Sequence, residues 1–477
     1  MAEVKRSEAA NIWRLGVSER RVLLIVGDLL MAGIALAVAL YFWASGIGTS
    51  NVGEVLQFLQ LRPPGWFYFL PFFWILLLLE TYDPHRASNW QQTRNSLIVA
   101  AALGMSIYVI FYFTSSPGSL PRRGVASFAL TALMLTTLWR LFYIRFFTGP
   151  QFSRRAVLVG AGNTGQALLK VIEGIHPAPY QILGVLDDNP KKRQKKVEGH
   201  KVIGGSEKLP RLIKNWGISD VLVAISGRME DNTFRVLIDA QEQGVEIIRM
   251  PVAYEELLDR VPINHLEADW TLRSFVDDAR INRFYELGTR LLDIVGGLVG
   301  VAILAVLTPL LAIAILVDSG RPIIYHQTRA GKGGKPYDII KFRTMRVDAE
   351  KNIGPQLTKE DDKRSTRVGR LLRKMHLDEW PQFINVLRGE MSLVGPRPER
   401  PELMRHFEKL IPFYRARLLA KPGITGWAQV NLGYAATLED MSVKLEYDLY
   451  YIKRRGPILD FIIILRTIAT IFGFRGR

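Results

Sequence analysis

Cysteine is missing from all 477 residues of the chain. Its absence excludes a thiol nucleophile, disulfide bonds, and zinc or iron–sulfur sites that are built on thiolates. Histidine is scarce, and none of the seven histidines stands in an HExxH-like pair, so no histidine-based metal site is expected. A Walker-type ATP motif is also missing, because Pro336 occupies the position in "GKGGKP" where a hydroxyl residue is required.

Acidic residues are too few to balance the basic ones. The chain has 62 Lys and Arg against 45 Asp and Glu, a net charge of +17, and yet 48% of its residues are hydrophobic. Charge and hydrophobicity must therefore occupy different parts of the chain, as in a membrane protein with basic cytoplasmic domains. Most of the excess positive charge lies after Arg280, so it belongs to the last part of the chain.

Residues 1–150 are predicted to form a bundle of four transmembrane helices. Four apolar segments approach the ~20 residues that a spanning helix needs, although the second is short and contains Pro71: 22–44, 66–79, 96–113 and 125–147. Asp28 lies inside the first segment and is expected to face the bundle interior, because a carboxylate that faces lipid is costly. Most flanking basic residues place the N-terminus and both ends of the bundle in the cytoplasm, although Arg122 and Arg123 lie in a loop on the other side.

Residues 151–280 have the pattern of a Rossmann-like (CoA-binding-like) cytoplasmic domain. "RRAVLVGAGNTGQALLKVI" indicates a strand, a glycine turn and a helix, and the following strands alternate with helices, which is typical of a parallel sheet. The turn carries Gly160, Gly162 and Gly165 in GxGxxG spacing, and Asp187 ends the next strand, where it could accept a hydrogen bond from a ribose. These four residues are candidates for nucleotide binding. The alternative is a fold that keeps the tight turn for packing alone.

Residues 281–477 begin with an apolar segment, 291–320, that is long enough to cross a bilayer. Pro309 predicts a kink or a break late in this segment, because proline lacks a backbone donor and clashes with the preceding turn. An ordinary fifth span would strand a strongly basic domain outside the cell, against the positive-inside trend. We therefore favour a re-entrant helix at about 286–318 that bends near Thr308 and Pro309 and returns to the cytoplasm. A β-hairpin follows it, and residues 458–474 have the mixed character of an interfacial helix.

Basic side chains gather in this last part of the chain. They suit phosphate oxygens, and the alternative is a surface that binds anionic lipid headgroups. The set comprises Arg329, Lys341, Arg343, Arg367, Arg370, Arg373 and Arg397. Phosphate contacts are favoured for Arg343, Arg373 and Arg397, because a rigid loop of Pro396, Arg397 and Pro398 is an unusual way to build a merely soluble surface.

Asp378 and Glu379 stand side by side in "DEWPQFINVLRG", which predicts a helix with both acids in its first turn. One interpretation is structural, since acids at that position offset the helix dipole and need no other role. The other is chemical, because neighbouring helical residues point about 100° apart and can flank one ion or phosphate with separate tasks. The dipole and the nearby cations are expected to keep both acids ionised, as attack on phosphorus and ligation of a hard cation require.

Three chained motifs carry a family resemblance: "KFRTM", "LDEWPQFINVLRGEMSLVGPRP" and "KPGITGWAQV". From about Arg283 onward the chain resembles the monotopic phosphoglycosyl transferases, the bacterial polyprenyl-phosphate sugar-1-phosphate transferases. The whole layout is similar to the long form of that family, with four spans, a Rossmann-like domain, and an α/β catalytic domain that carries a re-entrant helix. The resemblance implies a cytoplasmic UDP-sugar donor, a polyprenyl (undecaprenyl) phosphate acceptor, Mg²⁺ as cofactor, contact with membrane lipid, and no nucleic-acid partner.

The resemblance also implies roles for the acid pair. Asp378 would attack the sugar-bearing β-phosphate and expel UMP, and the lipid phosphate would then take the phosphosugar from the aspartyl intermediate. Glu379 would hold Mg²⁺ against the diphosphate. His376 and Trp380 depart from the commoner "SLDEL" of the family, which leaves the acid pair intact and the role of His376 open.

Basic residues complete the implied site. Lys341 and Arg373 match basic positions that contact phosphates, and Arg343 stands in the same motif as Lys341. Arg397, between Pro396 and Pro398, matches the loop near the nucleotide. Arg329 and Arg370 are the remaining candidates for substrate binding.

Two other functions are left open by the sequence. A membrane-anchored NAD-dependent nucleotide-sugar dehydratase or epimerase needs a YxxxK pair on a helix, whereas Tyr337 and Lys341 have that spacing in a strand-like stretch. A non-catalytic scaffold for polysaccharide assembly is the third reading. The expected setting is the first membrane step of exopolysaccharide, O-antigen or capsule synthesis at the bacterial cytoplasmic membrane. The sugar is open, with a neutral hexose favoured, and so is the oligomeric state, with a homodimer as the candidate.

Overall fold

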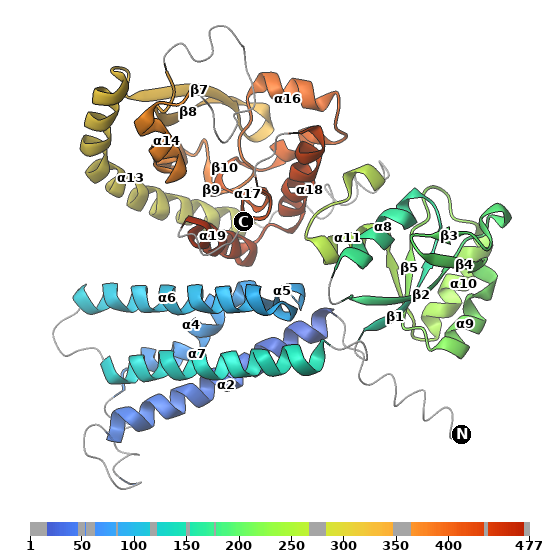
Figure 1. The fold of residues 1–477 in the computed structure, drawn as a ribbon. Coiled ribbons are helices and arrows are strands. Elements are labelled where there is room, and N and C mark those ends of the chain that lie inside the picture. The colour runs from blue at the N-terminus through green and yellow to red at the C-terminus, as the bar shows by residue number, and fades with distance from the viewer. Residues whose placement is uncertain are drawn as a thin grey trace. The chain divides into compact units, whose positions relative to one another are not determined.

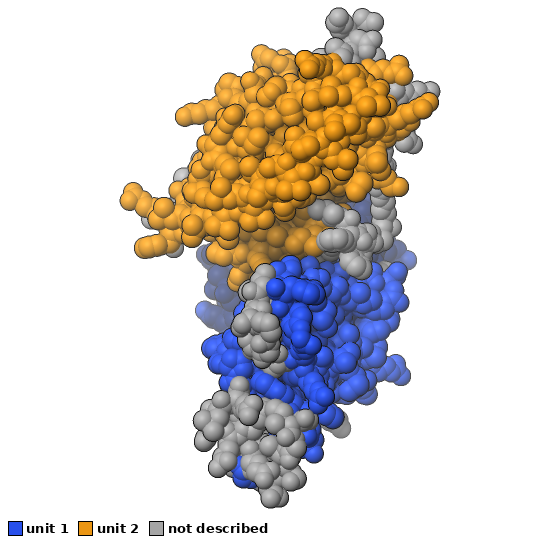
Figure 2. Space-filling view, turned by 90° about the vertical axis from the view of Figure 1, so that its left-hand side faces the viewer, with its two compact units in different colours: residues 1–250 blue, residues 251–477 orange. Residues whose placement is uncertain are grey.

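The computed structural model describes residues 17–45, 53, 63–82, 84–114, 122–148, 153–175, 178–266, 283–346, 364–433 and 437–471. The chain divides into two compact units, Met1–Met250 and Pro251–Arg477, which are blue and orange in Figure 2. The predicted transmembrane and Rossmann-like domains thus begin in the same unit. The predicted boundary near residue 280 lies outside the described residues, and residues 251–266 belong to the second unit.

Within the described part of residues 1–150, three helices are long and apolar enough to cross a membrane. They are α2 (Val17–Ser45), α6 (Trp90–Thr114) and α7 (Arg122–Phe147). The second predicted segment is shorter than a span and forms η1 (Gly65–Phe69) and α4 (Leu70–Leu77), with Pro71 in the first turn of α4, where its missing N–H does no harm. The short elements η2 (Leu79–Tyr82) and α5 (Pro84–Ser88) follow. Three of the four predicted spans therefore have the expected length, and the second does not.

A buried ion pair joins helices α2 and α7. Asp28 in α2 accepts a hydrogen bond from Arg140 in α7 at 2.5 Å, and neither side chain is exposed. Arg140 also donates to the backbone carbonyl and the hydroxyl of Thr81, at 3.1 and 2.7 Å. The prediction that Asp28 faces the interior of the bundle is confirmed, and an arginine balances its charge.

A six-stranded sheet forms the core of the following domain. Its strand order is β3-β4-β2-β1-β5-β6, and all neighbours are parallel except β3 and β4. The predicted parallel α/β pattern is therefore confirmed, with one antiparallel edge strand. The elements are β1 (Arg154–Val159), α8 (Asn163–Gly174), β2 (Tyr180–Leu186), η4 (Pro190–Lys192), β3 (Lys196–Val197), β4 (His200–Gly204), η5 (Ser206–Lys208), α9 (Leu209–Trp216), β5 (Asp220–Val223), α10 (Asp231–Glu242) and β6 (Glu246–Arg249).

The second unit packs helices around two small sheets (Figure 1). The predicted hairpin is present as the antiparallel strands β7 (Ile324–Ala330) and β8 (Pro336–Phe342). Strand β9 (Ser392–Val394) pairs in parallel with β10 (Gly423–Thr425). The other elements are α11 (Met250–Leu258), η6 (Ile263–His265), α13 (Arg283–Ser319), η8 (Lys332–Gly334), α14 (Arg367–Lys374), η9 (Leu377–Glu379), α15 (Gln382–Arg388), α16 (Pro401–Glu408), η10 (Tyr414–Leu419), α17 (Trp427–Asn431), α18 (Leu438–Arg454) and α19 (Pro457–Ile471).

Helix α13 continues through Pro309 without a break, and Figure 1 draws it as a helix that changes direction along its length. The hydroxyl of Thr308 donates to the carbonyl of Leu304 at 2.6 Å, a contact that bends helices. Pro309 also leaves one carbonyl in the preceding turn without its usual donor. The sequence predicted either a kink or a break near Pro309, and the helix does not break there.

Glycines let α13 lie against the helix that follows the acid pair. A Cβ atom at Gly297 would come within 2.7 Å of the Leu387 side chain, and one at Gly300 within 2.3 Å of Phe383. Both neighbours belong to α15. Small residues allow two helices to approach closely, so this face of α13 holds α15 and the preceding turn in place.

The start of α13 contacts later parts of the same unit. Glu286 in its first turn pairs with Lys332, in the turn between β7 and β8, at 3.5 Å. Arg290 donates to the carbonyl groups of Val386 and Leu387, near the end of α15, at 2.9 and 2.8 Å. Both contacts join the start of α13 to parts of the unit that follow it in sequence.

The end of α13 is held by the same domain. Asp318 accepts a hydrogen bond from the backbone N–H of Val368 in α14 at 2.9 Å. Arg343, which follows β8, donates to the carbonyl groups of Ser319 and Gly320 at 2.7 and 2.6 Å. Both ends of the apolar helix are therefore anchored on one folded unit.

The last helix, α19, is more buried than the predicted interfacial helix. Asp460 is buried and accepts from the hydroxyls of Tyr285 and Tyr451 at 2.8 and 3.1 Å. Arg466 is buried as well and donates to Asn431 at 2.5 Å. Asp460 and Arg466, the charged residues on which the prediction of an interfacial helix rested, are therefore buried against other protein groups.

Candidate active site

A left-handed residue and a short 3₁₀ turn present the two acids. His376 has a φ of 55°, and its N–H donates to the carbonyl of Arg373 at 3.1 Å. The turn Leu377–Glu379 follows, and α15 begins only at Gln382. The prediction that both acids lie in the first turn of the helix is therefore wrong by a few residues. The reason is Pro381, which begins helices rather than continuing them.

Glu379 is in direct contact with two cations. Its Oε1 accepts from Nζ of Lys341 at 2.8 Å and from Nη2 of Arg397 at 2.5 Å, and its Oε2 accepts from Nη1 of Arg397 at 3.1 Å. Burial by itself raises the pKa of Glu379, but the Arg397 guanidinium and the Lys341 ammonium hold that pKa well below its usual range. The carboxylate is therefore ionised, and the two-pronged contact with Arg397 fixes its orientation.

Asp378 is only 8% exposed and lies among the same cations. Burial and the neighbouring charge of Glu379 raise the pKa of Asp378, while Lys341, Arg373 and Arg397 act in the opposite direction. The sequence predicted that both acids stay ionised; the structure instead pushes their pKa values apart, because Glu379 has the two direct cation contacts. Environments that separate two carboxylates in this way suit them to different tasks.

The carboxylates of this site suit a hard cation that brings further ligands of its own. Among the residues that the structure describes, no group of three or more His, Asp or Glu side chains could hold a metal ion. Mg²⁺ commonly takes one or two carboxylates and completes its octahedron with waters and substrate phosphates. Asp378 and Glu379 therefore fit Mg²⁺ in the company of a diphosphate.

The other predicted basic residues have different surroundings. Arg373 donates to the hydroxyl of Ser365 at 2.9 Å and is close enough to Asp378 to lower its pKa. Arg370 is exposed on α14. Arg343 donates to carbonyl groups at the end of α13 and so caps that helix, and its predicted phosphate contacts stay a prediction.

The loop of residues 396–399 is held by its carbonyl groups. Each of its four consecutive carbonyls accepts one hydrogen bond from outside the loop. The donors, in chain order of the acceptors, are Gly423 N, Arg417 Nη2, Arg329 Nη1 and Ala330 N, at 3.0, 2.9, 3.1 and 3.0 Å. Arg329, a predicted substrate-binding residue, thus holds the backbone of Pro398.

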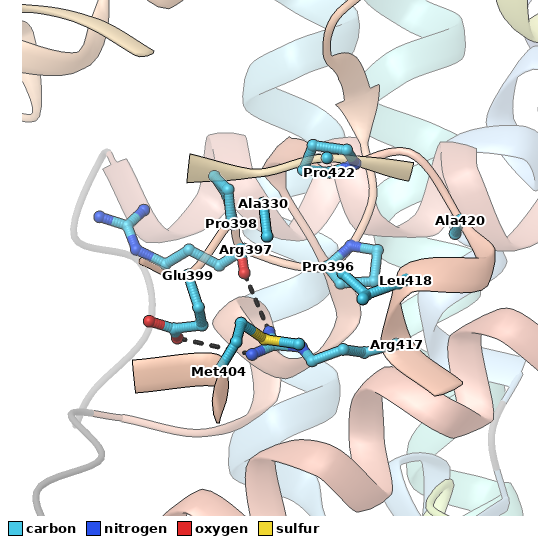
Figure 3. A pocket seen from close by; sticks show the side chains of 11 residues that line it. Ala330, Pro396, Arg397, Pro398, Glu399, Met404, Arg417, Leu418, Ala420 and Pro422 are labelled. Atoms are coloured by element: carbon cyan, nitrogen blue, oxygen red, sulfur yellow. Dashed lines mark hydrogen bonds and ion pairs between the residues drawn. The ribbon is translucent and has the colours of Figure 1, made fainter. Parts of the chain in front are cut away.

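Sequence reasoning missed the ion network behind this loop. Arg417 donates to Asp448 at 2.8 Å and lies 3.6 Å from Glu399, which also pairs with Lys444 at 2.5 Å. Burial by itself raises the pKa of Glu399, but Lys444 and Arg417 lower it to about 2. Figure 3 shows Arg417 and Glu399 pointing toward one another beside a small pocket, while the guanidinium of Arg397 points away. The sequence contained one signal of this network: Asp448 lies on the apolar face of its helix, where a buried charge needs a partner.

The glycine turn of the Rossmann-like domain is closed by its own contacts. Gly160 has a φ of 112°, and a Cβ atom there would come within 2.5 Å of the carbonyl oxygen of Ala224. Asp187 accepts from the N–H of Ala161 at 2.7 Å and from Lys192 at 2.9 Å. These contacts fit the packing interpretation of the turn, and nucleotide binding by Gly160, Gly162, Gly165 and Asp187 stays a prediction.

Two known families match this chain. Residues 284–474 match a family described as bacterial sugar transferase, and residues 78–251 match one described as CoA-binding domain. Among solved structures, UDP-D-quinovosamine 4-dehydrogenase from Vibrio fischeri is similar over 25% of this chain and 98% of that chain, at 21% identity. Its TM-score of 0.19 is too low to carry an argument.

Several curated relatives are undecaprenyl-phosphate sugar phosphotransferases by name. UDP-N-acetylgalactosamine-undecaprenyl-phosphate N-acetylgalactosaminephosphotransferase of Aeromonas hydrophila is 41% identical over 47% of this chain and 52% of its own. UDP-glucose:undecaprenyl-phosphate glucose-1-phosphate transferase of Xanthomonas campestris pv. campestris is 31% identical over 58% of this chain and 57% of its own. The transferase of the same name from Caulobacter vibrioides is 42% identical over 39% of this chain and 70% of its own. The chain spans about half the length of the first two relatives. With the matched domain, these similarities show that the chain belongs to the bacterial sugar transferase family of phosphoglycosyl transferases.

Proposed function

We propose that this chain transfers a sugar-1-phosphate from a UDP-sugar to undecaprenyl phosphate. The observation that carries the proposal is the position of Asp378, a buried carboxylate under the influence of three cations. Two successive phosphoryl transfers need charge neutralisation and in-line positioning more than acid–base catalysis. The names of the relatives specify the same donor and acceptor classes.

The first step forms a covalent bond between the protein and the substrate. An Oδ atom of Asp378 attacks the β-phosphorus of the UDP-sugar. The bond from that phosphorus to the oxygen bridging the α-phosphate breaks, and UMP leaves with the electron pair. Asp378 then carries the sugar phosphate as an acyl phosphate.

The second step returns the protein to its starting state. A phosphate oxygen of undecaprenyl phosphate attacks the phosphorus held on Asp378. The bond to the Asp378 oxygen breaks, the carboxylate is regenerated, and the product is an undecaprenyl diphosphate sugar. This order requires Asp378 to be accessible to both a soluble nucleotide and a lipid phosphate.

Mg²⁺ is the proposed cofactor, and Glu379 is its proposed ligand. When bound, the metal neutralises charge on the diphosphate oxygens. Arg397 and Arg373 bind phosphate oxygens through their guanidinium forks, and Lys341 supplies a point charge beside Glu379. The contacts of Lys341 and Arg397 with Glu379 support this division of roles.

Helix α13 is proposed to be re-entrant. A spanning helix would separate the residues before and after it by a hydrocarbon core of about 30 Å. The support for re-entry is that Glu286 near its start pairs with Lys332, beyond its end, at 3.5 Å. Re-entry keeps the Rossmann-like domain and the catalytic unit on the same side of the membrane, and the flanking basic residues favour the cytoplasmic side of a bacterial inner membrane for both domains and for the N-terminus.

The family's long-form layout completes the proposal. It comprises a four-span bundle in residues 1–150, in which the short segment of η1 and α4 stands in the place of the second span, a Rossmann-like domain in 151–280 and a catalytic domain in 281–477, assembled as a homodimer in contact with membrane lipid. The product would be the first lipid-linked intermediate of an exopolysaccharide, O-antigen or capsule. The relatives' names include both glucose and N-acetylgalactosamine, so the donor sugar is a question for experiment, with a neutral hexose favoured.

The test uses purified full-length protein in nanodiscs with Mg²⁺ and undecaprenyl phosphate. A panel of UDP-glucose, UDP-galactose and UDP-N-acetylgalactosamine is expected to give release of UMP from one donor without NAD. Conversion of a UDP-sugar that needs NAD and releases no UMP would favour the dehydratase or epimerase. That alternative is disfavoured, because Lys341 of its YxxxK match lies on strand β8 and pairs with Glu379.

A further inference from the structure

Arg417 lies outside the set of residues proposed to touch the substrate, yet it holds one of them by its backbone. Its Nη2 donates to the carbonyl of Arg397 at 2.9 Å. We infer that Arg417 is a positioning residue, which fixes the backbone of residues 396–399 so that the guanidinium of Arg397 reaches Glu379 and the substrate diphosphate. This inference rests on the proposed function for its kinetic consequences, but not for its structural ones.

The loop depends on donors from elsewhere because two of its residues are prolines. Pro396 and Pro398 have no N–H, so the loop has few donors of its own with which to close a turn. Backbone N–H groups hold the first and last of its four carbonyls. The two middle carbonyls, those of Arg397 and Pro398, are held by the side chains of Arg417 and Arg329. The part of the loop that carries the Arg397 side chain therefore depends on arginine donors.

Arg417 is itself held rigidly. It is 4% exposed, and besides the loop carbonyl it donates to the hydroxyl of Tyr414 at 2.9 Å and to Asp448 at 2.8 Å. Glu399, at 3.6 Å, adds a second carboxylate on the loop side. A planar guanidinium has donors for all of these groups at once, whereas a lysine ammonium keeps the charge but not the fork. Arg417→Lys is therefore the substitution that separates charge from positioning.

The kinetic test compares Arg417→Lys with a matched control. Arg417→Lys is expected to lower the kcat for UMP release by about 10- to 100-fold, because a misplacement on the order of 1 Å can cost about that much. KM is expected to change less, since Arg397 would act on charge that develops during the transfer. The control is Arg415→Lys, at an exposed position of the same η10. Its kcat is expected to stay within about twofold of the wild-type value, because surface substitutions usually have small effects.

A double-mutant comparison separates positioning from general support of the fold. In an Arg397→Gln background no guanidinium is left at position 397 for Arg417 to position. Arg417→Lys is therefore expected to lower the kcat of that background by less than about twofold. If Arg417 only stabilised the unit, its substitution would lower the rate by the same factor in both backgrounds. Additive losses would overturn the inference.

Hydrogen exchange tests the inference independently of the reaction. In nanodiscs, the amides of Gly395, Arg397, Glu399 and Arg400 are expected to exchange faster in folded Arg417→Lys than in wild-type protein or in Arg415→Lys. Unchanged exchange in this loop would overturn the inference. Should Arg417→Lys fail to fold, Arg329→Met removes the other side-chain donor without touching the pair of Arg417 with Asp448, and the same result is expected. A wild-type protein that releases no UMP would refute the proposed function and leave this measurement intact.

Discussion

The guanidinium of Arg397 lies across both carboxylate oxygens of Glu379, with N–O distances of 2.5 and 3.1 Å, although the two residues are 18 positions apart. The pair joins the acid motif to the proline loop. Lys341, from strand β8, contacts the same carboxylate at 2.8 Å. Three motifs that are separate in the sequence thus meet at one side chain, and a change at Glu379 is expected to disturb all three.

Glu379→Gln is predicted to lower the rate of UMP release by at least about 100-fold, as the loss of one preorganised electrostatic group commonly does. The amide keeps the size of the side chain but removes the charge that pairs with Arg397 and would bind Mg²⁺. The measurement is UMP release over a titration of Mg²⁺. Glu408→Gln, at an exposed position at the end of α16, is the control. A Glu379→Gln protein with the wild-type rate and Mg²⁺ dependence would refute the role of Glu379.

Asp28→Ala is predicted to destabilise the transmembrane bundle by about 3–5 kcal/mol, because it leaves the buried charge of Arg140 without its partner. The double variant Asp28→Leu, Arg140→Met removes both charges and is expected to recover much of that loss. Thermal unfolding in detergent measures both, with Leu30→Ala on the exposed side of α2 as the control. Equal stability of the single and double variants would contradict the pairing.

Glu446 in α18 is predicted to make the second unit less stable as the pH rises. Burial raises the pKa of Glu446 from an ordinary 4.5 to about 7, although Arg260 and Tyr254 act against that shift. The folded state therefore binds the proton more tightly than the unfolded state. The added stability is complete below a pH of about 4.5 and is lost as the pH rises through about 7. The free energy of unfolding is expected to fall by on the order of 2–3 kcal/mol over this range.

Chemical denaturation of the full chain between pH 4.5 and pH 8 measures this pH dependence. Glu446→Gln is expected to flatten the dependence, because an amide has no proton to lose. Glu439→Gln changes an exposed acid on the same helix and should keep the wild-type slope. Identical slopes for wild-type and Glu446→Gln proteins would show that Glu446 is not the responsible group.

The absence of cysteine makes the topology of α13 directly testable. Arg283→Cys, at its start, and Lys335→Cys, beyond its end, each introduce the single thiol of the chain at an exposed position. Re-entry predicts that a membrane-impermeant maleimide labels both, together with Lys195→Cys in the Rossmann-like domain, only in inverted vesicles. Labelling of Lys335→Cys in intact cells, with Arg283→Cys protected, would instead show a spanning helix.

Local sequence patterns predicted the parallel sheet, the hairpin and most of the apolar helices, because periodicity and glycine turns act over short stretches of chain. They also placed Asp28 inside the bundle. They misplaced the acids relative to α15, since the effect of Pro381 on the start of the helix was underestimated. The pattern of α19 suggested an interface because burial of Asp460 depends on tyrosines from α13 and α18.

Contacts between distant residues were beyond the reach of these patterns. Nothing near Asp28 in the sequence points to Arg140, and nothing near Arg397 points to Arg417. Arg343 resembled a phosphate ligand by its motif, and only the folded chain shows its contacts with the end of α13. Ion pairs of this kind are specified by tertiary packing, so a single sequence identifies the charges but not their partners.

Intact-mass analysis after exposure to UDP-sugars tests the central claim most directly. Wild-type protein incubated with its donor and Mg²⁺, without undecaprenyl phosphate, is predicted to gain the mass of one sugar phosphate and to lose it again when the lipid phosphate is added. Asp378→Asn is predicted to gain nothing, while Asp338→Asn, at an exposed position of β8, gains the same mass as wild type. An adduct that persists in Asp378→Asn, or UMP release by wild-type protein with no adduct at all, would contradict attack by Asp378.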